Sequence, residues 1–102
     1  MTRQISGTGL QAHKVPQVAR VGLALKSEVP AIALPPKVHY RTRTYGRVPD
    51  FRVSNAEAAI AEILDVQRRV QTMLDMPPEI VANKFRRLAM EVNDFLWIHD
   101  AF

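Results

Sequence analysis

The sequence predicts a mainly α protein, in which a long extended, proline-rich basic arm precedes an antiparallel two-helix hairpin. Three observations predict this class. Five of the seven prolines and all four glycines lie before residue 51, two apolar stripes with helical spacing lie after it, and Pro77-Pro78 separates the stripes. We therefore divide the chain into an arm, residues 1–47, and a helical hairpin, residues 48–102, with helices at about 55–75 and 78–100.

The arm shows little regular periodicity. Residues 1–11 are polar and contain glycine, so we expect them to be irregular. Residues 16–26 fit a short helix or a strand equally well, because apolar and small or polar residues alternate after a proline. Residues 29–36 contain three prolines, which indicates an extended segment that cannot supply the backbone donors of a central strand. We expect the arm to build no core of its own.

Residues 37–47, KVHYRTRTYGR, form the most suggestive stretch of the arm. In an extended chain, alternate side chains point to one side, which would align cations with aromatic rings along one edge. Such an edge suits phosphates and stacking on unpaired bases. The alternative is a charged edge strand that keeps the protein soluble or lies in an acidic protein groove. The candidate nucleic-acid-binding residues are Lys37, Arg41, Arg43, Tyr45 and Arg47.

Charge is divided unevenly along the chain. Residues 1–50 carry eight basic and two acidic side chains, a net charge of +6. Residues 51–102 carry six basic and eight acidic side chains, a net charge of −2, and the two values add to the overall +4. This asymmetry favours an arm that binds an anionic partner while the helices serve a different role.

The first predicted helix begins at a capping box. Ser54 and Glu57 have the spacing in which a serine hydroxyl accepts from a free backbone N–H and the glutamate reaches back. Ile60 and Leu74 widen the apolar stripe that follows. Polar residues off the stripe, including Glu62 and Asp65, are predicted to lie on a solvated face. The stripe itself consists of Ala56, Ala59, Ile63, Val66, Val70 and Met73.

The second predicted helix follows the double proline. Pro77 disfavours helical geometry before it, whereas Pro78 fits the first helical position, with Glu79 favourable beside the helix N-terminus. So short a connection forces the helices to pack antiparallel. We expect the aromatic residues at helical spacing to pack in the core. The second stripe consists of Val81, Phe85, Leu88, Val92, Phe95 and Phe102.

Two apolar residues near the end of the second helix lie off its stripe. Trp97 and Ile98 project from the far side, where an isolated hairpin leaves them in contact with water. A hairpin of about fifty residues also buries too little surface to be comfortably stable alone. We therefore predict self-association or docking on a host protein, with Trp97, Ile98 and Phe102 as the candidate partner interface.

The sequence contains no pattern typical of catalysis or cofactor binding. Cysteine is absent, and His13, His39 and His99 lie far apart in the sequence, outside any metal-binding pair. Glu62 and Asp65 are interpreted as surface acids. We expect no enzyme, no cofactor and no metal. No apolar run approaches the ~20 residues that cross a bilayer, so we also expect a soluble protein without a membrane partner.

Residues 45–96 contain five short motifs: Tyr45-Gly46, Asp50-Phe51, Pro78-Glu79-Ile80-Val81, Lys84-Phe85 and Asn93-Asp94-Phe95-Leu96. Their pattern resembles the C-terminal half of the internal scaffolding proteins of gokushovirus-like microviruses, which are small single-stranded DNA phages. The resemblance implies a non-enzymatic protein on the inner face of a capsid shell. The first 44 residues lack the pattern, which leaves a transient scaffold and a permanent component as alternatives.

Three functional hypotheses follow. The first is a structural protein of a virion or similar large assembly, located in the virion or the host cytoplasm. Its hairpin would dock on a shell or capsid protein or on a second copy, and its arm would run along neighbours or packaged single-stranded nucleic acid. The alternative is a small ribosomal or other nucleoprotein component that binds RNA through the arm. A helical subunit of an enzyme complex ranks last, because it has no clear use for a cationic arm.

Overall fold

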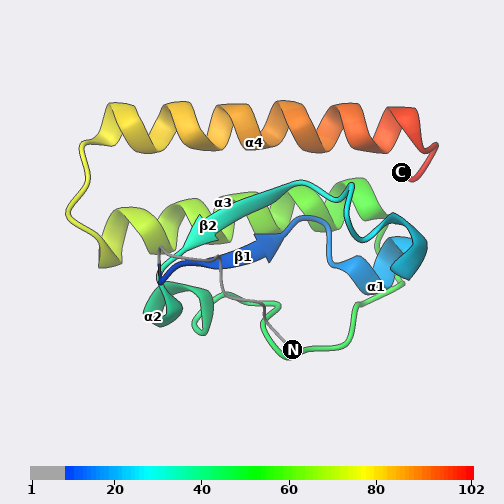
Figure 1. The fold of residues 1–102 in the computed structure, drawn as a ribbon, viewed down its shortest axis with the longest axis horizontal. Helices are drawn as coiled ribbons and strands as arrows, with labels where there is room; N and C mark the ends of the chain where they lie inside the picture. The colour runs from blue at the N-terminus through cyan, green and yellow to red at the C-terminus, as the bar shows by residue number, and fades with distance from the viewer. Residues whose placement is uncertain (1–8) are drawn as a thin grey trace.

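The computed structural model describes residues 9–102, and two long antiparallel helices dominate it. Helix α3 (Asn55–Met73) and helix α4 (Pro78–Ile98) pack along their length, and a two-stranded sheet lies against them (Figure 1). The predicted helical hairpin is confirmed. Both helices end about two residues before their predicted ends.

The helix boundaries follow from local chemistry. The backbone N–H of Glu57 donates to Ser54 Oγ over 3.1 Å, which confirms the predicted cap. Helix α3 ends where Leu74 becomes extended, at φ −118° and ψ 144°. Pro77 then caps α4, and Pro78 takes its first helical position. The short connection between the helices holds them antiparallel.

The C-terminal residues return to the beginning of α3. Helix α4 ends at Ile98, and Asp100 has a positive φ of 48°, which turns the chain. Asn55 then holds the chain end, because its Nδ2 donates to the carbonyl of Ala101 over 2.8 Å and its backbone N–H donates to the carbonyl of Phe102 over 3.0 Å. The two ends of the hairpin are therefore tied together.

The sheet is formed by residues far apart in the sequence. Strand β1 (Gln11–Lys14) pairs antiparallel with β2 (Ala31–Leu34), with His13 opposite Ile32. The connection contains helix α1 (Val18–Val21) and the 3-10 helix η1 (Leu23–Leu25). Of the two structures predicted for residues 16–26, the helical one forms, but as two short pieces. Gly22 separates them, with a φ of 96° that other residues rarely adopt.

The structure does not support an extended arm over the part of residues 1–47 that it describes; residues 1–8 lie outside the described part. Residues 9–47 contain both strands and the short helix α2 (Pro36–His39), and they contribute to the core. The prolines bracket β2 instead of interrupting it, because Pro30 precedes the strand and Pro35 follows it. The alternation within β1 buries Gln11 and His13.

One core unites both halves of the described chain. The predicted stripe of α4 is confirmed from Val81 to Phe95, and the middle of the α3 stripe is buried with it. Side chains from the sheet and α2 cover these stripes. In the described residues, no helix combines the length and the apolar character needed to cross a membrane. The buried apolar residues are Val15, Val29, Leu34, Val38, Ala59, Val66, Val70, Val81, Phe85, Leu88, Val92, Phe95 and Leu96.

Candidate interaction surfaces

The end of α4 presents large apolar side chains to solvent. Trp97 is 68% exposed and Ile98 is 77% exposed. The ring of Trp97 meets the ring of Phe102 edge to face, with centroids 4.8 Å apart, and Phe102 remains 42% exposed. The three residues of the predicted partner interface therefore lie near one another at one end of the molecule.

Phe102 was also predicted to pack in the core, and that prediction is wrong. Phe85 and Phe95 are buried as expected, at 3% and 5% exposure. The periodic pattern fails after Ile98, because the helix ends there and the turn at Asp100 redirects the chain. Phe102 consequently packs on the Trp97 ring, outside the core stripe.

The apolar surface continues along the helix face that the sheet leaves uncovered. Met90 and Trp97 are seven residues apart, so they lie on the same side of α4, and Met90 is also exposed. On α3, Ile60 and Leu64 are one turn apart, on the side away from Glu62, which contacts β1. We call Ile60, Leu64, Met90 and Trp97 the open-face patch. Ile60 was expected to widen the core stripe, but it is 60% exposed.

The candidate nucleic-acid-binding residues do not lie on one edge of a strand. Residues 36–39 form α2, and turns follow as far as Gly46, so the alternation of an extended chain is absent there. Lys37, Arg41 and Arg47 are nevertheless exposed. The side chain of Arg43 is half-exposed and lies 3.7 Å from a Glu62 oxygen, so its charge is partly compensated.

Two tyrosines lie among these cations. The rings of Tyr40 and Tyr45 have centroids 4.9 Å apart, and Tyr45 also packs edge to face on His39, at 5.0 Å. Tyr40 is 51% exposed and Tyr45 is 40% exposed, so each keeps part of its ring accessible to solvent. Tyr40, which the sequence analysis did not select, joins Tyr45 because the turns that follow α2 fold residues 40–46 back on themselves.

A buried polar cluster lies beneath the cationic turns. His13 and Glu62 are almost fully buried, and their Nε2 and Oε1 atoms are 2.7 Å apart, so the imidazole donates to the carboxylate. The rings of His13 and His39 lie 5.0 Å apart. Glu62 was predicted to lie on the surface, and that prediction is wrong; His13 and His39, although far apart in the sequence, lie next to each other in the fold. Pairing of β1 with β2 and packing on α3 bring them together.

The same cluster fastens the cationic turns to α3. The backbone N–H of Arg43 donates to Asp65 Oδ2 over 2.9 Å. Asp65, also predicted on the surface, is buried and lies 3.4 Å from Arg69 Nε. A buried carboxylate needs such donors, because burial of an unpaired charge is costly. The only sequence signal for this buried cluster was that Glu62, Asp65 and Arg69 recur at helical spacing on one side of α3.

Burial changes the protonation of His39. The pKa of His39 is lowered from 6.5 to about 4, chiefly by desolvation on burial and also by the neighbouring His13, while Glu62 opposes the change. The ring is therefore neutral near pH 7. His13, His39 and Glu62 are all at most 5% exposed. This cluster acts as a structural connection between β1, α2 and α3.

Arginines also line a hollow of about 360 Å³ beside α3. Arg20 is already used there, because its guanidinium donates to the carbonyls of Asp50, over 2.6 Å, and Val53, over 3.1 Å. Acidic residues share the wall, including Glu57 and Glu62. The hollow has mixed charge and does not form a uniform anion site.

Comparisons assign neither a family nor a relative. Among residues 9–102, no group of three or more His, Asp or Glu side chains is placed to hold a metal ion. No family model, no curated protein and no solved structure matches the chain.

Proposed function

We propose that this chain is a non-enzymatic structural component of a virion or similar large assembly, which docks on a shell protein through the end of its helical hairpin. The observation that carries the proposal is the exposure of Trp97 and Ile98 beside Phe102. Trp97 is also part of the open-face patch, so the apolar surface extends along both helices. The microvirus-like motifs in residues 45–96 support the same function.

The energetics favour a partner at this surface. Complete burial of one large apolar side chain stabilises a complex by roughly 1.5–3 kcal/mol. Tryptophan at the centre of an interface is a frequent dominant contact, because it combines a large apolar area with a polar N–H. Trp97, Ile98 and Met90 offer several such contacts from one helix. A shell protein with an apolar groove would cover them.

The test is co-purification with a candidate shell protein. The tagged chain and the shell protein are expressed together, and the bound fraction is compared for the parent and Trp97→Ala. Leu23→Ala is the matched control, because Leu23 is a large apolar residue that is 81% exposed on η1 and belongs neither to the predicted interface of Trp97, Ile98 and Phe102 nor to the open-face patch. We expect Trp97→Ala to reduce capture at least about tenfold while helix content stays constant.

Three results would contradict the proposal. Equal capture by Trp97→Ala and Leu23→Ala would exclude the C-terminal surface, and absence of capture by the parent would exclude the shell protein. Loss of helix content together with capture would mean that Trp97 stabilises the fold. The parent is also measured alone by sedimentation, where a concentration-dependent dimer that Trp97→Ala abolishes would identify a second copy as the partner.

A second candidate function is binding of single-stranded nucleic acid, as in a ribosomal or other nucleoprotein component. It is favoured by Lys37, Arg41 and Arg47, which are exposed near the accessible rings of Tyr40 and Tyr45. Deletion of residues 1–47 is not a usable test, because residues 9–47 supply part of the core. Point substitutions leave that core intact.

For this candidate, labelled single-stranded DNA and RNA are titrated at low and moderate salt. The variant replaces Lys37, Arg41 and Arg47 by alanine, and the control replaces the exposed Lys26, Arg68 and Arg86 by alanine. If the turns contact phosphates, the variant should lose about two units of salt dependence, since each cation on a single strand contributes ~0.7. Equal binding by both triple variants would exclude a localised site.

A further inference from the structure

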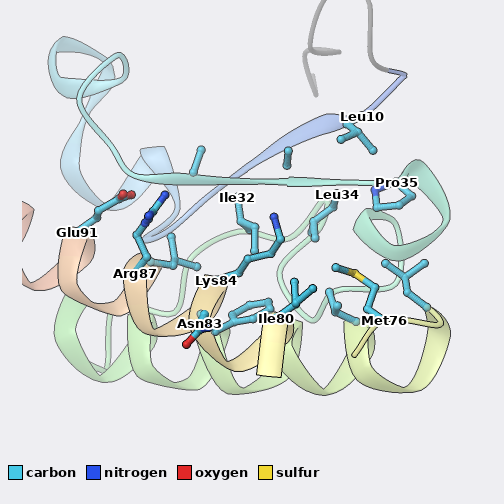
Figure 2. A pocket seen from close by; sticks show the side chains of 16 residues that line it. Leu10, Ile32, Leu34, Pro35, Met76, Ile80, Asn83, Lys84, Arg87 and Glu91 are labelled. Atoms are coloured by element: carbon cyan, nitrogen blue, oxygen red, sulfur yellow. The ribbon is translucent and has the colours of Figure 1, made fainter. Parts of the chain in front are cut away.

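A groove of about 580 Å³ lies between β2 and α4 (Figure 2). Its floor is apolar, with Leu34 from the strand and Phe85 and Leu88 from the helix. Ile80 and Met76 close one end, near the turn between the helices. The groove lies on the sheet side of α4 and uses none of the residues of the open-face patch.

The wall formed by β2 has unpaired main-chain groups. Val15 donates its N–H to the carbonyl of Pro30 over 2.9 Å, so this pair belongs to the hydrogen-bonded positions of the antiparallel ladder. Hydrogen-bonded and non-hydrogen-bonded pairs alternate. Ile32 and Leu34 therefore face β1 with their N–H and C=O groups, while those of Ala31 and Ala33 point to the other edge.

That other edge borders the groove. Ala31 and Ala33 line the groove. Within residues 9–102, no hydrogen bond uses the outward N–H or C=O groups of these two residues. The sheet contains only β1 and β2 in the described chain, so β2 has no strand on this side. An unpaired strand edge beside an apolar floor is the geometry that accepts an added strand.

The opposite wall has a definite charge. Lys84 and Arg87 rise from α4 toward β2, and both are exposed (Figure 2). Glu91 lies one turn beyond Arg87, so the positive charge is confined to the part of the wall near Lys84. Acidic side chains on a bound segment would meet these two cations and avoid Glu91.

We propose that this groove binds an extended acidic peptide segment of a partner protein as a third strand on β2. Its main chain bonds to Ala31 and Ala33, and alternate apolar side chains enter the floor above Phe85 and Leu88. The intervening acidic side chains lie on the solvent side of the added strand, where they attract the charged ends of the long Lys84 and Arg87 side chains that reach up from α4 beside it. A small amphipathic acid would fill the floor and meet the same cations, but it would leave the outward amide groups of β2 unpaired. A peptide satisfies all three features.

The first test uses a short fluorescein-labelled peptide in which leucine and aspartate alternate, titrated with the full chain and followed by anisotropy. Ala33→Pro removes the outward N–H while the ladder to β1 stays intact, and should weaken binding roughly tenfold. Ala12→Pro is the matched control. Ala12 is the partner of Ala33 in the ladder, and its N–H points outward at the β1 edge of the sheet, on the side away from β2 and the groove. Ala12→Pro should bind like the parent.

A second measurement leaves the protein unchanged. The same peptide with an N-methyl group on every amide cannot donate to β2 in either register, and should bind roughly tenfold more weakly to the parent chain. Charge is tested with the double variant Lys84→Glu and Arg87→Glu, which should lose the leucine-aspartate peptide and gain a leucine-lysine peptide. Arg86→Glu, outside the groove lining, serves as the charge control.

Several outcomes would overturn the proposal. Absence of saturable binding by the leucine-aspartate peptide would exclude this ligand class. Equal affinity of the parent for methylated and unmethylated peptides would exclude strand addition. Competition by decanoate, combined with indifference to N-methylation, would identify a site for small amphipathic acids. Loss of peptide binding in Trp97→Ala would place the peptide on the surface around Trp97 that is proposed to dock on the shell protein. Failure of the groove proposal can therefore be told apart from failure of the proposed function.

Discussion

The buried imidazole of His39 should make the fold acid-sensitive. Its folded pKa of about 4 lies well below the ordinary value of 6.5, so between these values the unfolded chain binds more protons than the folded chain. Stability from the neutral ring is complete above pH 6.5 and is lost as the pH falls toward 4. At pH 4.5 the loss amounts to about 2.5 kcal/mol, a large fraction of a small domain's stability.

The assay is urea denaturation at pH 7.5 and pH 4.5, with the free energy of unfolding taken from each curve. His39→Gln removes the titrating group. The free energy of unfolding of this variant should therefore fall by about 2 kcal/mol less between pH 7.5 and pH 4.5 than that of the parent. His99→Gln is the control, because His99 packs on Phe95 at the far end of α4, outside the cluster. Equal pH dependence of the parent and His39→Gln would refute the reasoning.

Three further substitutions test the contacts that define the fold. Ser54→Ala removes the acceptor for the Glu57 N–H and should lower the free energy of unfolding by about 1 kcal/mol with little change in helix content; no loss would mean that the cap is unimportant. Glu62→Ala leaves the buried His13 without its acceptor and should cost about 1–3 kcal/mol in urea denaturation, whereas Glu57→Ala, on an exposed position, should cost much less. Asn55→Ala should release the chain end and change the near-ultraviolet circular dichroism of Trp97, and an unaltered spectrum would contradict that coupling.

The helical hairpin could be predicted from the sequence because its determinants are local. A capping serine, two stripes with helical period and a double proline lie within about fifty residues, and each acts on its near neighbours. The ends were overestimated, since the period carries no information about where Leu74 and His99 leave helical geometry. The exposure of Trp97 and Ile98 was predictable for the same reason: both lie off the stripe.

The structure of residues 9–47 was not predictable in this way, because its determinants are distant. Strand β1 finds β2 across a long connection, and only that pairing explains why His13 is buried. Glu62 lies on the polar side of α3 by its spacing, and becomes buried because β1 covers that side. A helical period separates apolar from polar positions, but it does not show which polar positions a second element will cover.

The two proposed surfaces lie on different sides of the same helix. Lys84, in the groove, and Trp97, in the open-face patch, are thirteen residues apart, which at 3.6 residues per turn separates them by about 140° around α4. Ile98, by contrast, lies fourteen residues from Lys84 and only about 40° from it around α4, so partners at both surfaces are accommodated where the shell protein covers Trp97, Met90 and Phe102. Substitutions at distant sites with no common partner combine nearly additively, within about 0.5 kcal/mol. Peptide affinity in Trp97→Ala should thus equal that of the parent, and shell-protein capture should be unaffected by Ala33→Pro, the behaviour of a protein that joins two components of an assembly.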